Sequence, residues 1–241
     1  MRSATSRAGL TALLLGALGA ACTPETAVPE ATGGTPATGG SATGGTSTGG
    51  KASAGSAPAL RSSTADPTYA TSGPWHGYIW PAVDAGGVAT ISPTAAQGFR
   101  SGGPPFCVQG HVPPTTNSTA VAMVGMNTNQ ERTGGAVAAQ WTPTGVGILV
   151  NVSNPGGSPL RLQIQTNETG AVAQLWCAML TQFNQNVVVR WSDLKTQCWN
   201  NSGSTYDQSM AGIATVMVLV PGTSQAGGYD FDFCVNELTP V

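Results

Sequence analysis

One stretch of the chain, residues 160–165, alternates strictly between aliphatic and polar side chains. Its aliphatic positions are Leu160, Leu162 and Ile164, and its polar positions are Arg161, Gln163 and Gln165. A β-strand sends successive side chains to opposite faces, so this alternation predicts one buried face and one face with a guanidinium and two amides. Such a row offers hydrogen-bond donors and acceptors to a hydroxyl-rich ligand, and it contains no nucleophile or proton shuttle. The alternative is a solvated outer face of an antiparallel sheet without a ligand.

The carboxylates of residues 72–241 are sparse and scattered. They are Asp84, Glu131, Glu168, Asp193, Asp207, Asp230, Asp232 and Glu237. Glycoside hydrolysis needs two carboxylates that face one cleft. Glu131 and Glu168 form the best acid and nucleophile pair, but both lie in turn-like sequence, where two solvated loop carboxylates are the alternative. The sequence also lacks the Gly-x-Ser-x-Gly and His-Glu-x-x-His motifs. We therefore assign no catalytic residue.

Two aspartates near the end of the chain, Asp230 and Asp232, alternate with Phe231 and Phe233. The alternation places both carboxylates on the face opposite the phenylalanines, where their oxygens are candidate ligands of a structural calcium ion. The alternative is a pair of exposed aspartates on a final strand. No other cofactor is expected.

Six tryptophans stand out in a chain of which 8 % is charged, namely Trp75, Trp80, Trp141, Trp176, Trp191 and Trp199. An indole ring matches the apolar face of a pyranose, whereas most tryptophans of a small domain belong to its core. We expect core positions for Trp80 and Trp191. Trp176 and Trp199 each adjoin a cysteine, so they either cover a disulfide or stack on a ligand.

Four cysteines follow residue 72, namely Cys107, Cys177, Cys198 and Cys234. An even number in an exported chain predicts two disulfides, and four cysteines allow three pairings. The first and last strands of a jelly roll are often neighbours, which favours Cys107 with Cys234 and Cys177 with Cys198. A zinc site is the alternative, although no Cys-x-x-Cys pair is present.

The N-terminal residues 1–21 have the layout of a secretory signal peptide. Arg2 and Arg7 precede an apolar run that is too short to remain as a membrane-spanning helix. The small residues before Cys22 resemble a bacterial lipoprotein cleavage and lipidation site. Thr23, in place of an aspartate, indicates the outer membrane or cell surface. Ordinary cleavage near Ala21, which would give a secreted protein, is the alternative.

Residues 22–71 consist almost entirely of Thr, Gly, Ala, Ser and Pro, with Thr-Gly-Gly repeated four times. Such a composition buries too little apolar surface to offset chain entropy, which predicts a disordered linker behind the lipid anchor. Residues 72–241 are then one domain of chain. The net charge of −2 and the lack of a basic stripe argue against a nucleic-acid partner. We expect a monomer whose membrane contact is made by the lipid anchor alone.

Short runs rich in Val, Ile, Trp and Phe, separated by Gly, Pro, Asn and Ser clusters, fill residues 72–241. The expected strands are 78–80, 88–92, 120–127, 137–141, 147–152, 160–165, 174–179, 187–191, 213–220 and 229–235. Many short strands with frequent turn signals predict an all-β fold, an antiparallel β-sandwich or jelly roll.

Seven ordered blocks of sequence resemble the galactose-binding-type β-sandwich modules, a group that includes many carbohydrate-binding modules and that accompanies glycanases in myxobacteria. The blocks are 125–130, 141–148, 158–165, 176–178, 189–199, 218–222 and 231–235. The resemblance implies a sheet face that binds polysaccharide. On this chain its contacts are Asn127, Asn129, Arg161, Gln163 and Gln165, with Trp141 and Trp176 as stacking aromatics.

Three functions compete on these observations. The leading one is non-catalytic glycan binding by a surface-anchored module. The second is a jelly-roll glycoside hydrolase or lyase, and the third is a structural or adhesion lipoprotein of the cell envelope without a sugar ligand.

Overall fold

The computed structural model describes residues 59–63, 66–84, 86–100, 103–133, 138–166, 174–209 and 211–241. The expected signal peptide, Cys22, most of the expected linker and Glu168 lie outside this part of the chain. Within it, no helix has the length and apolar character needed to cross a membrane.

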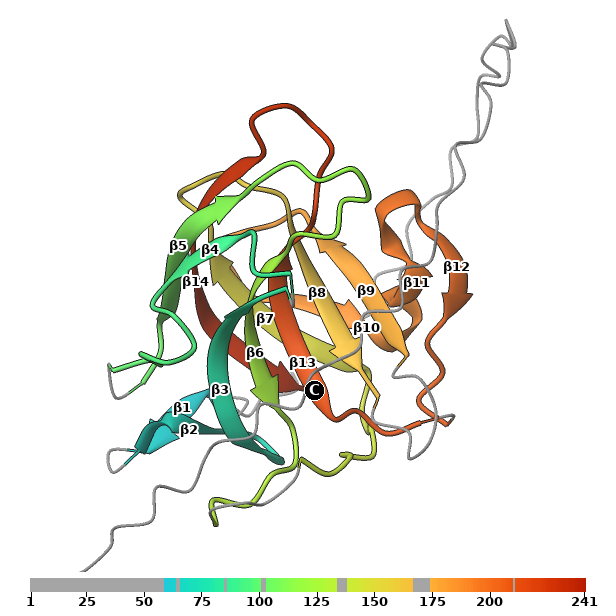
Figure 1. Cartoon of the computed structure of the whole chain (residues 1–241). Helices are drawn as coiled ribbons and strands as arrows, with labels where there is room; N and C mark the ends of the chain where they lie inside the picture. The colour runs from blue at the N-terminus through green and yellow to red at the C-terminus, as the bar shows by residue number, and fades with distance from the viewer. Residues whose placement is uncertain are drawn as a thin grey trace, which may run out of the picture.

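Two β-sheets pack face to face (Figure 1). The larger sheet has nine strands in the order β1-β2-β3-β6-β13-β8-β9-β11-β12. In sequence order these strands are β1 (Arg61–Ser63), β2 (Asp66–Ser72), β3 (Trp75–Val83), β6 (Ala122–Asn127), β8 (Leu160–Gln165), β9 (Leu175–Leu180), β11 (Lys195–Gln197), β12 (Ser202–Thr205) and β13 (Thr215–Val220). Two short 3₁₀ helices flank β11, namely η1 (Trp191–Asp193) and η2 (Cys198–Asn200).

The smaller sheet has five strands in the order β10-β7-β14-β5-β4. They are β4 (Thr90–Ser92), β5 (Phe106–Val112), β7 (Gly147–Ser153), β10 (Val187–Arg190) and β14 (Tyr229–Pro240). Every pairing between named strands, in both sheets, is antiparallel.

Eight of these strands have the connectivity of a jelly roll. Consecutive strands lie in opposite sheets in three pairs: β5 and β6, β7 and β8, and β13 and β14. The four strands β5-β14-β7-β10 therefore face the four strands β6-β13-β8-β9. This order interleaves the first, middle and last strands of the chain, as in a double-sheet jelly roll. The predicted all-β antiparallel sandwich is confirmed.

The core lies between the sheets and follows the two-residue period of each strand. In β8, Leu160, Leu162 and Ile164 are fully buried and face the other sheet, as their alternation predicts. Phe106 of β5 and Phe233 of β14 are the largest buried side chains on the opposing side. The inner faces interdigitate and form one continuous core.

Five aromatic rings form a series through one part of this core. Their contacts run from Trp75 to Trp141 (5.6 Å between ring centroids), Trp191 (6.3 Å), Tyr206 (6.1 Å) and Trp176 (5.1 Å). We call these rings the aromatic series. The expected core position of Trp191 is confirmed, because its side chain is 6 % exposed.

The folded domain begins earlier than residue 72. Residues 61–72 form β1 and β2, so the boundary drawn from composition is wrong by about a dozen residues. Leu60 is buried, and its backbone N–H donates to Glu237 Oε1 at 2.9 Å. Tyr69 and Ala70 of β2 are buried as well. A few well-spaced apolar residues therefore hold in the sheet a segment whose small and polar majority predicted disorder.

We expect Leu60→Ala to lower the free energy of unfolding by about 2–5 kcal/mol, because a buried leucine side chain is replaced by a cavity. Urea denaturation followed by tryptophan fluorescence measures the change. The exposed neighbour gives the control, Ala59→Ser, for which the change should stay within about 0.5 kcal/mol. Equal effects of the two substitutions would place Leu60 outside the cooperative core.

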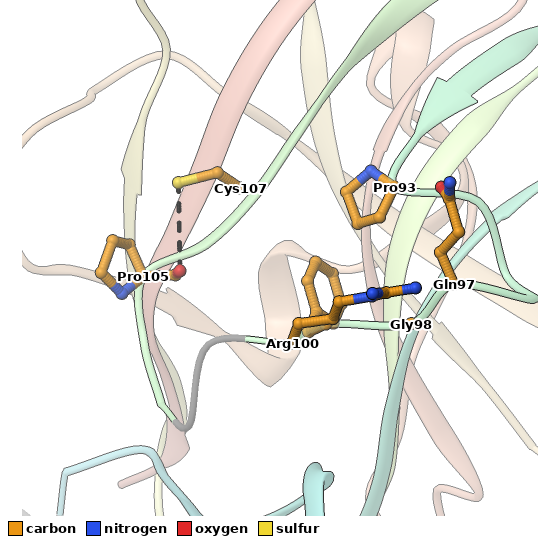
Figure 2. A pocket seen from close by; sticks show the side chains of 7 residues that line it. Pro93, Gln97, Gly98, Arg100, Pro105 and Cys107 are labelled. Atoms are coloured by element: carbon orange, nitrogen blue, oxygen red, sulfur yellow. Dashed lines mark hydrogen bonds between the residues drawn. The ribbon is translucent and has the colours of Figure 1, made fainter.

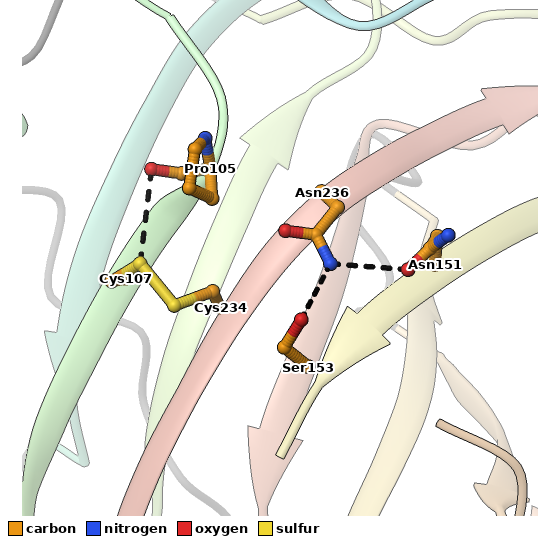
Figure 3. Close-up of a disulfide and its surroundings, with 6 residues drawn as sticks. All are labelled: Pro105, Cys107, Asn151, Ser153, Cys234 and Asn236. Carbon is orange, nitrogen blue, oxygen red and sulfur yellow. Dashed lines mark hydrogen bonds between the residues drawn. A yellow bond between two sulfur atoms is a disulfide. The ribbon is translucent and has the colours of Figure 1, made fainter. Parts of the chain in front are cut away.

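Both predicted disulfides are confirmed. Cys107 and Cys234 lie directly opposite each other on β5 and β14, 127 positions apart in sequence, on the outer face of the five-stranded sheet (Figure 3). Cys177 of β9 is joined to Cys198 of η2. The zinc alternative is therefore wrong, because all four thiols are oxidised.

Candidate functional site

The side chains on the outer face of the nine-stranded sheet form three rows across its strands, and we call this surface the outer-sheet face. Strand register sets the rows, because residues directly opposite each other point to the same side. The middle row is Trp80, Gly125, Met217, Gln163 and Cys177. The second row is Ala82, Met123, Leu219, Arg161 and Met179. The third row is Asn127, Thr215, Gln165 and Leu175.

The predicted row of Arg161, Gln163 and Gln165 thus lies along one strand at the centre of this face, as the alternation required. In the sheet order, β8 stands between β13 and β9. The side chains of Gln163 and Gln165 form no hydrogen bond with another described residue. Gln165 is partly exposed and keeps its amide donors and carbonyl acceptor for a ligand, whereas Gln163 is buried, with 7 % of its surface exposed.

The indole of Trp80 lies on the outer-sheet face and not in the core, so its expected core position is wrong. A Cβ atom on Gly125 would collide with this ring, so the glycine makes the space that the indole occupies. Trp80 Nε1 donates to Asn127 Oδ1 at 3.5 Å. The sequence signal was ambiguous because β3 is apolar on both faces. Counting in twos from the buried Trp75 and Ile79 places Trp80 on the opposite side.

Asn127 belongs to the outer-sheet face, and its side chain is already bonded. Its Nδ2 group donates to Gln130 Oε1 at 2.6 Å, and its Oδ1 atom accepts from Thr215 Oγ1 at 3.3 Å. With the Trp80 contact, this network fixes the indole and the amide relative to each other. Asn127 therefore orients Trp80 as well as lining the surface.

Arg161 is partly buried among apolar neighbours. Leu219 and Met179 flank it on the adjacent strands, and Leu219 is fully buried although it points outward. The Nε atom of Arg161 is buried without a hydrogen-bond partner. Burial lowers the pKa of the guanidinium to about 10, since desolvation disfavours its charged form. At neutral pH the group still carries its charge.

Three predicted contacts lie away from the outer-sheet face. Asn129 lies beyond the end of β6, where it bridges to His76 and its Nδ2 group donates to the backbone oxygen of Gln140 at 3.0 Å. Trp176 belongs to the aromatic series and is 3 % exposed, whereas Trp141, in the same series, is partly buried and packs against the core. The structure does not bring these three together with Arg161, and the buried ring of Trp176 is not placed to stack on a surface ligand.

The candidate catalytic carboxylate Glu131 is exposed, and its Oε1 atom lies 3.7 Å from His76 Nε2 at the end of the sandwich. Glu168, its expected partner, lies outside the described residues. The three rows of the outer-sheet face contain no carboxylate and no imidazole. The arrangement of this face suits hydrogen bonding and stacking.

The aspartates predicted to bind calcium lie on the outer face of the five-stranded sheet. Asp230 Oδ1 contacts His111 Nδ1 at 2.7 Å, and Asp232 pairs in register with Gln109. In the part of the chain that the structure describes, no cluster of three or more His, Cys, Asp or Glu side chains could hold a metal ion. A calcium ion here would draw on two protein carboxylates at most, so calcium binding stays a prediction.

A cavity of about 390 Å³ lies beside the Cys107–Cys234 disulfide on this second face (Figure 2). Its lining is mostly apolar and includes Phe99, and its polar side chains are Gln97 and Arg100. Gln97 accepts a hydrogen bond from the backbone N–H of Thr94 at 2.8 Å, so it fixes its own loop. Around the disulfide, Asn236 Nδ2 donates to Asn151 Oδ1 and Ser153 Oγ (Figure 3). The Asn236 amide is therefore used within the protein.

No protein-family model matches this chain, and no curated protein sequence is significantly similar to it.

Proposed function

We propose that this domain binds polysaccharide on its outer-sheet face without catalysing a reaction. The observation that carries the proposal is the row of Arg161, Gln163 and Gln165 on the same face as the indole of Trp80. Sugar hydroxyls need donors and acceptors in fixed positions, and the pyranose ring needs an apolar surface beside them. Strand geometry holds both at a spacing that loops would not fix.

The proposal includes the anchoring of the domain. Residues 1–21 act as the signal peptide, and lipid on Cys22 holds the protein at the outer membrane or cell surface, as the sequence resemblance to bacterial lipoproteins implies. The linker then separates the binding face from the membrane. The likeness to galactose-binding-type modules supports the same assignment, since that group includes many carbohydrate-binding proteins.

Trp80→Ala is expected to weaken polysaccharide affinity about tenfold, because the substitution removes both the stacking surface and the hydrogen bond from the indole to Asn127. Affinity electrophoresis on gels that contain xylan, β-glucan or galactan measures the change. Trp80→Phe keeps an aromatic ring and should recover part of the affinity. Melting temperatures of each variant establish that binding is measured on folded protein.

The matched control is Gln109→Ala on the outer face of the five-stranded sheet, which should leave affinity unchanged. If Trp80→Ala binds as well as the unaltered protein, or if no polysaccharide retards the protein, the outer-sheet face is not a glycan site. The release of reducing sugar by the unaltered protein would favour the hydrolase instead.

A further inference from the structure

Arg161 is a partly buried charge without an opposite charge among the described residues. Its guanidinium is charged at neutral pH, its Nε atom is buried without a partner, and its neighbours across the sheet are Leu219 and Met179. A charge taken partly out of water is unfavourable unless an opposite charge or several hydrogen bonds compensate it. Among the described residues, no carboxylate pairs with Arg161; the carboxylate contacts there join Glu131 to His76 and Asp230 to His111.

Among the described residues, the strands around Arg161 offer no substitute carboxylate. Strands β3, β6, β8, β9 and β13, which form the outer-sheet face, contain no Asp or Glu in their sequences. Asp84 follows β3, three strand positions from β8 in the sheet, which is about 14 Å between strand axes. Its Oδ1 atom accepts the backbone N–H of Val121 at 3.3 Å. No carboxylate of the described residues is therefore placed to pair with Arg161.

We infer that the polysaccharide bound by the outer-sheet face carries uronate carboxylates, and that Arg161 pairs with one of them. The inference rests on the proposed function, because it names the substrate class of that same site. A guanidinium presents a planar set of donors that matches the two oxygens of a carboxylate, and it has no acceptor for a hydroxyl proton. A neutral sugar would leave the charge without compensation.

Two further features favour a carboxylate ligand. The apolar neighbours Leu219 and Met179 lower the local dielectric, so an ion pair formed there is stronger than one at an open surface. Gln165, on the same face of β8, is partly exposed, and its amide is available to the hydroxyls near the carboxylate. The chain as a whole has a net charge of −2, so general attraction does not bring it to a polyanion.

The test compares polygalacturonate and alginate, each with the same polymer after carboxyl reduction, which converts uronate into neutral sugar. The unaltered protein should bind the uronate polymers at least tenfold more tightly than the reduced ones. In Arg161→Gln this preference should fall to twofold or less, and Arg161→Lys should keep part of it because the charge remains.

Lys195→Gln provides the matched control. Lys195 lies on the same face, opposite Cys177 of β9, and its Nζ atom already donates to the backbone oxygen of Asn201 at 3.2 Å. Both glutamine variants change the net charge from −2 to −3, so an effect of overall charge would be equal in the two. Only Arg161→Gln should lose the preference. The melting temperature of Arg161→Gln should not fall. If Arg161 had a purely structural role, its replacement would give a less stable protein.

The outcomes separate the inference from the proposed function. Equal binding of uronate and reduced polymers, or binding of neutral polysaccharide alone, would overturn the inference and leave the glycan-binding proposal intact. A retained preference in Arg161→Gln would place the carboxylate elsewhere and also overturn it. Binding of a sulfated galactan, without binding of the uronate polymers, would overturn the inference. The anion that pairs with Arg161 would then be a sulfate. If the unaltered protein binds no polysaccharide, both proposals fail.

Discussion

Replacement of Cys107 and Cys234 together by alanine is expected to lower the free energy of unfolding by about 5 kcal/mol. The bond joins residues 127 positions apart, so its loss gives the unfolded chain a large gain in conformational freedom. The two cysteines lie opposite each other in the sheet, and alanine fits the same backbone there. Urea denaturation of the oxidised proteins measures the difference.

The second disulfide supplies the comparison. Cys177 and Cys198 are 21 positions apart, and their joint replacement should cost about 3.5 kcal/mol on the same entropic basis. The m-value, the slope of the free energy of unfolding against urea concentration, should rise in both variants, because a chain without the cross-link exposes more surface on unfolding. A larger loss from the shorter loop would show that native packing, and not loop closure, governs the contribution of these bonds.

Trp75→Ala is expected to destabilise the domain by about 3–5 kcal/mol. Trp75 is fully buried at the start of β3, and its ring begins the aromatic series by contacting Trp141 at 5.6 Å. Truncation removes the largest buried side chain and leaves a cavity that rigid neighbouring strands cannot close. The free energy of unfolding, again from urea denaturation, gives the magnitude.

Two phenylalanine substitutions test the polar part of the same argument. Trp75 Nε1 is buried without an acceptor, so Trp75→Phe removes an uncompensated donor and should cost less than about 2 kcal/mol. Trp191 Nε1 donates to the backbone oxygen of Gly145 at 3.2 Å, so Trp191→Phe breaks a bond and should cost more than Trp75→Phe. The reverse order would mean that Trp75 Nε1 has a partner.

The fold was predictable where strand alternation coincided with clear turn residues. The stretch 160–165 shows this, because its aliphatic residues set the register and its polar residues necessarily share the outer face. Strand β5 was not predicted. Its sequence, Phe-Cys-Val-Gln-Gly-His-Val, mixes a glycine and polar residues into a run that reads as a loop. Its pairing with β14, and not its own composition, makes it a strand.

The site was predictable only in part, because composition does not show which face of a strand is buried in the core. Gln163 and Gln165 were correctly placed on one outer face, whereas Trp176 was offered as a ligand contact although its neighbours in β9 alternate to put it inside. For Trp80, the deciding partner is Gly125 on another strand. That no carboxylate among the described residues pairs with Arg161 is a fact of tertiary structure, and no single strand sequence contains it.

Strand β14 lies between β7 and β5, so the middle of the five-stranded sheet is supplied by residues 229–240. A chain made from its N-terminus presents β5 and β7 long before the strand that joins them. Until β14 has been synthesised, the five-stranded sheet lacks its central strand, and β5 and β7 lack the strand with which both pair.

The same order of arrival acts on the thiols. Of the four cysteines that form disulfides, Cys107 emerges first, and Cys177 and Cys198 both follow it before its native partner Cys234. Oxidation that keeps pace with synthesis would join Cys107 to Cys177, the next thiol in the chain. The native pairing therefore requires either that Cys107 stays reduced until β14 is made, or that the premature bond is exchanged afterwards.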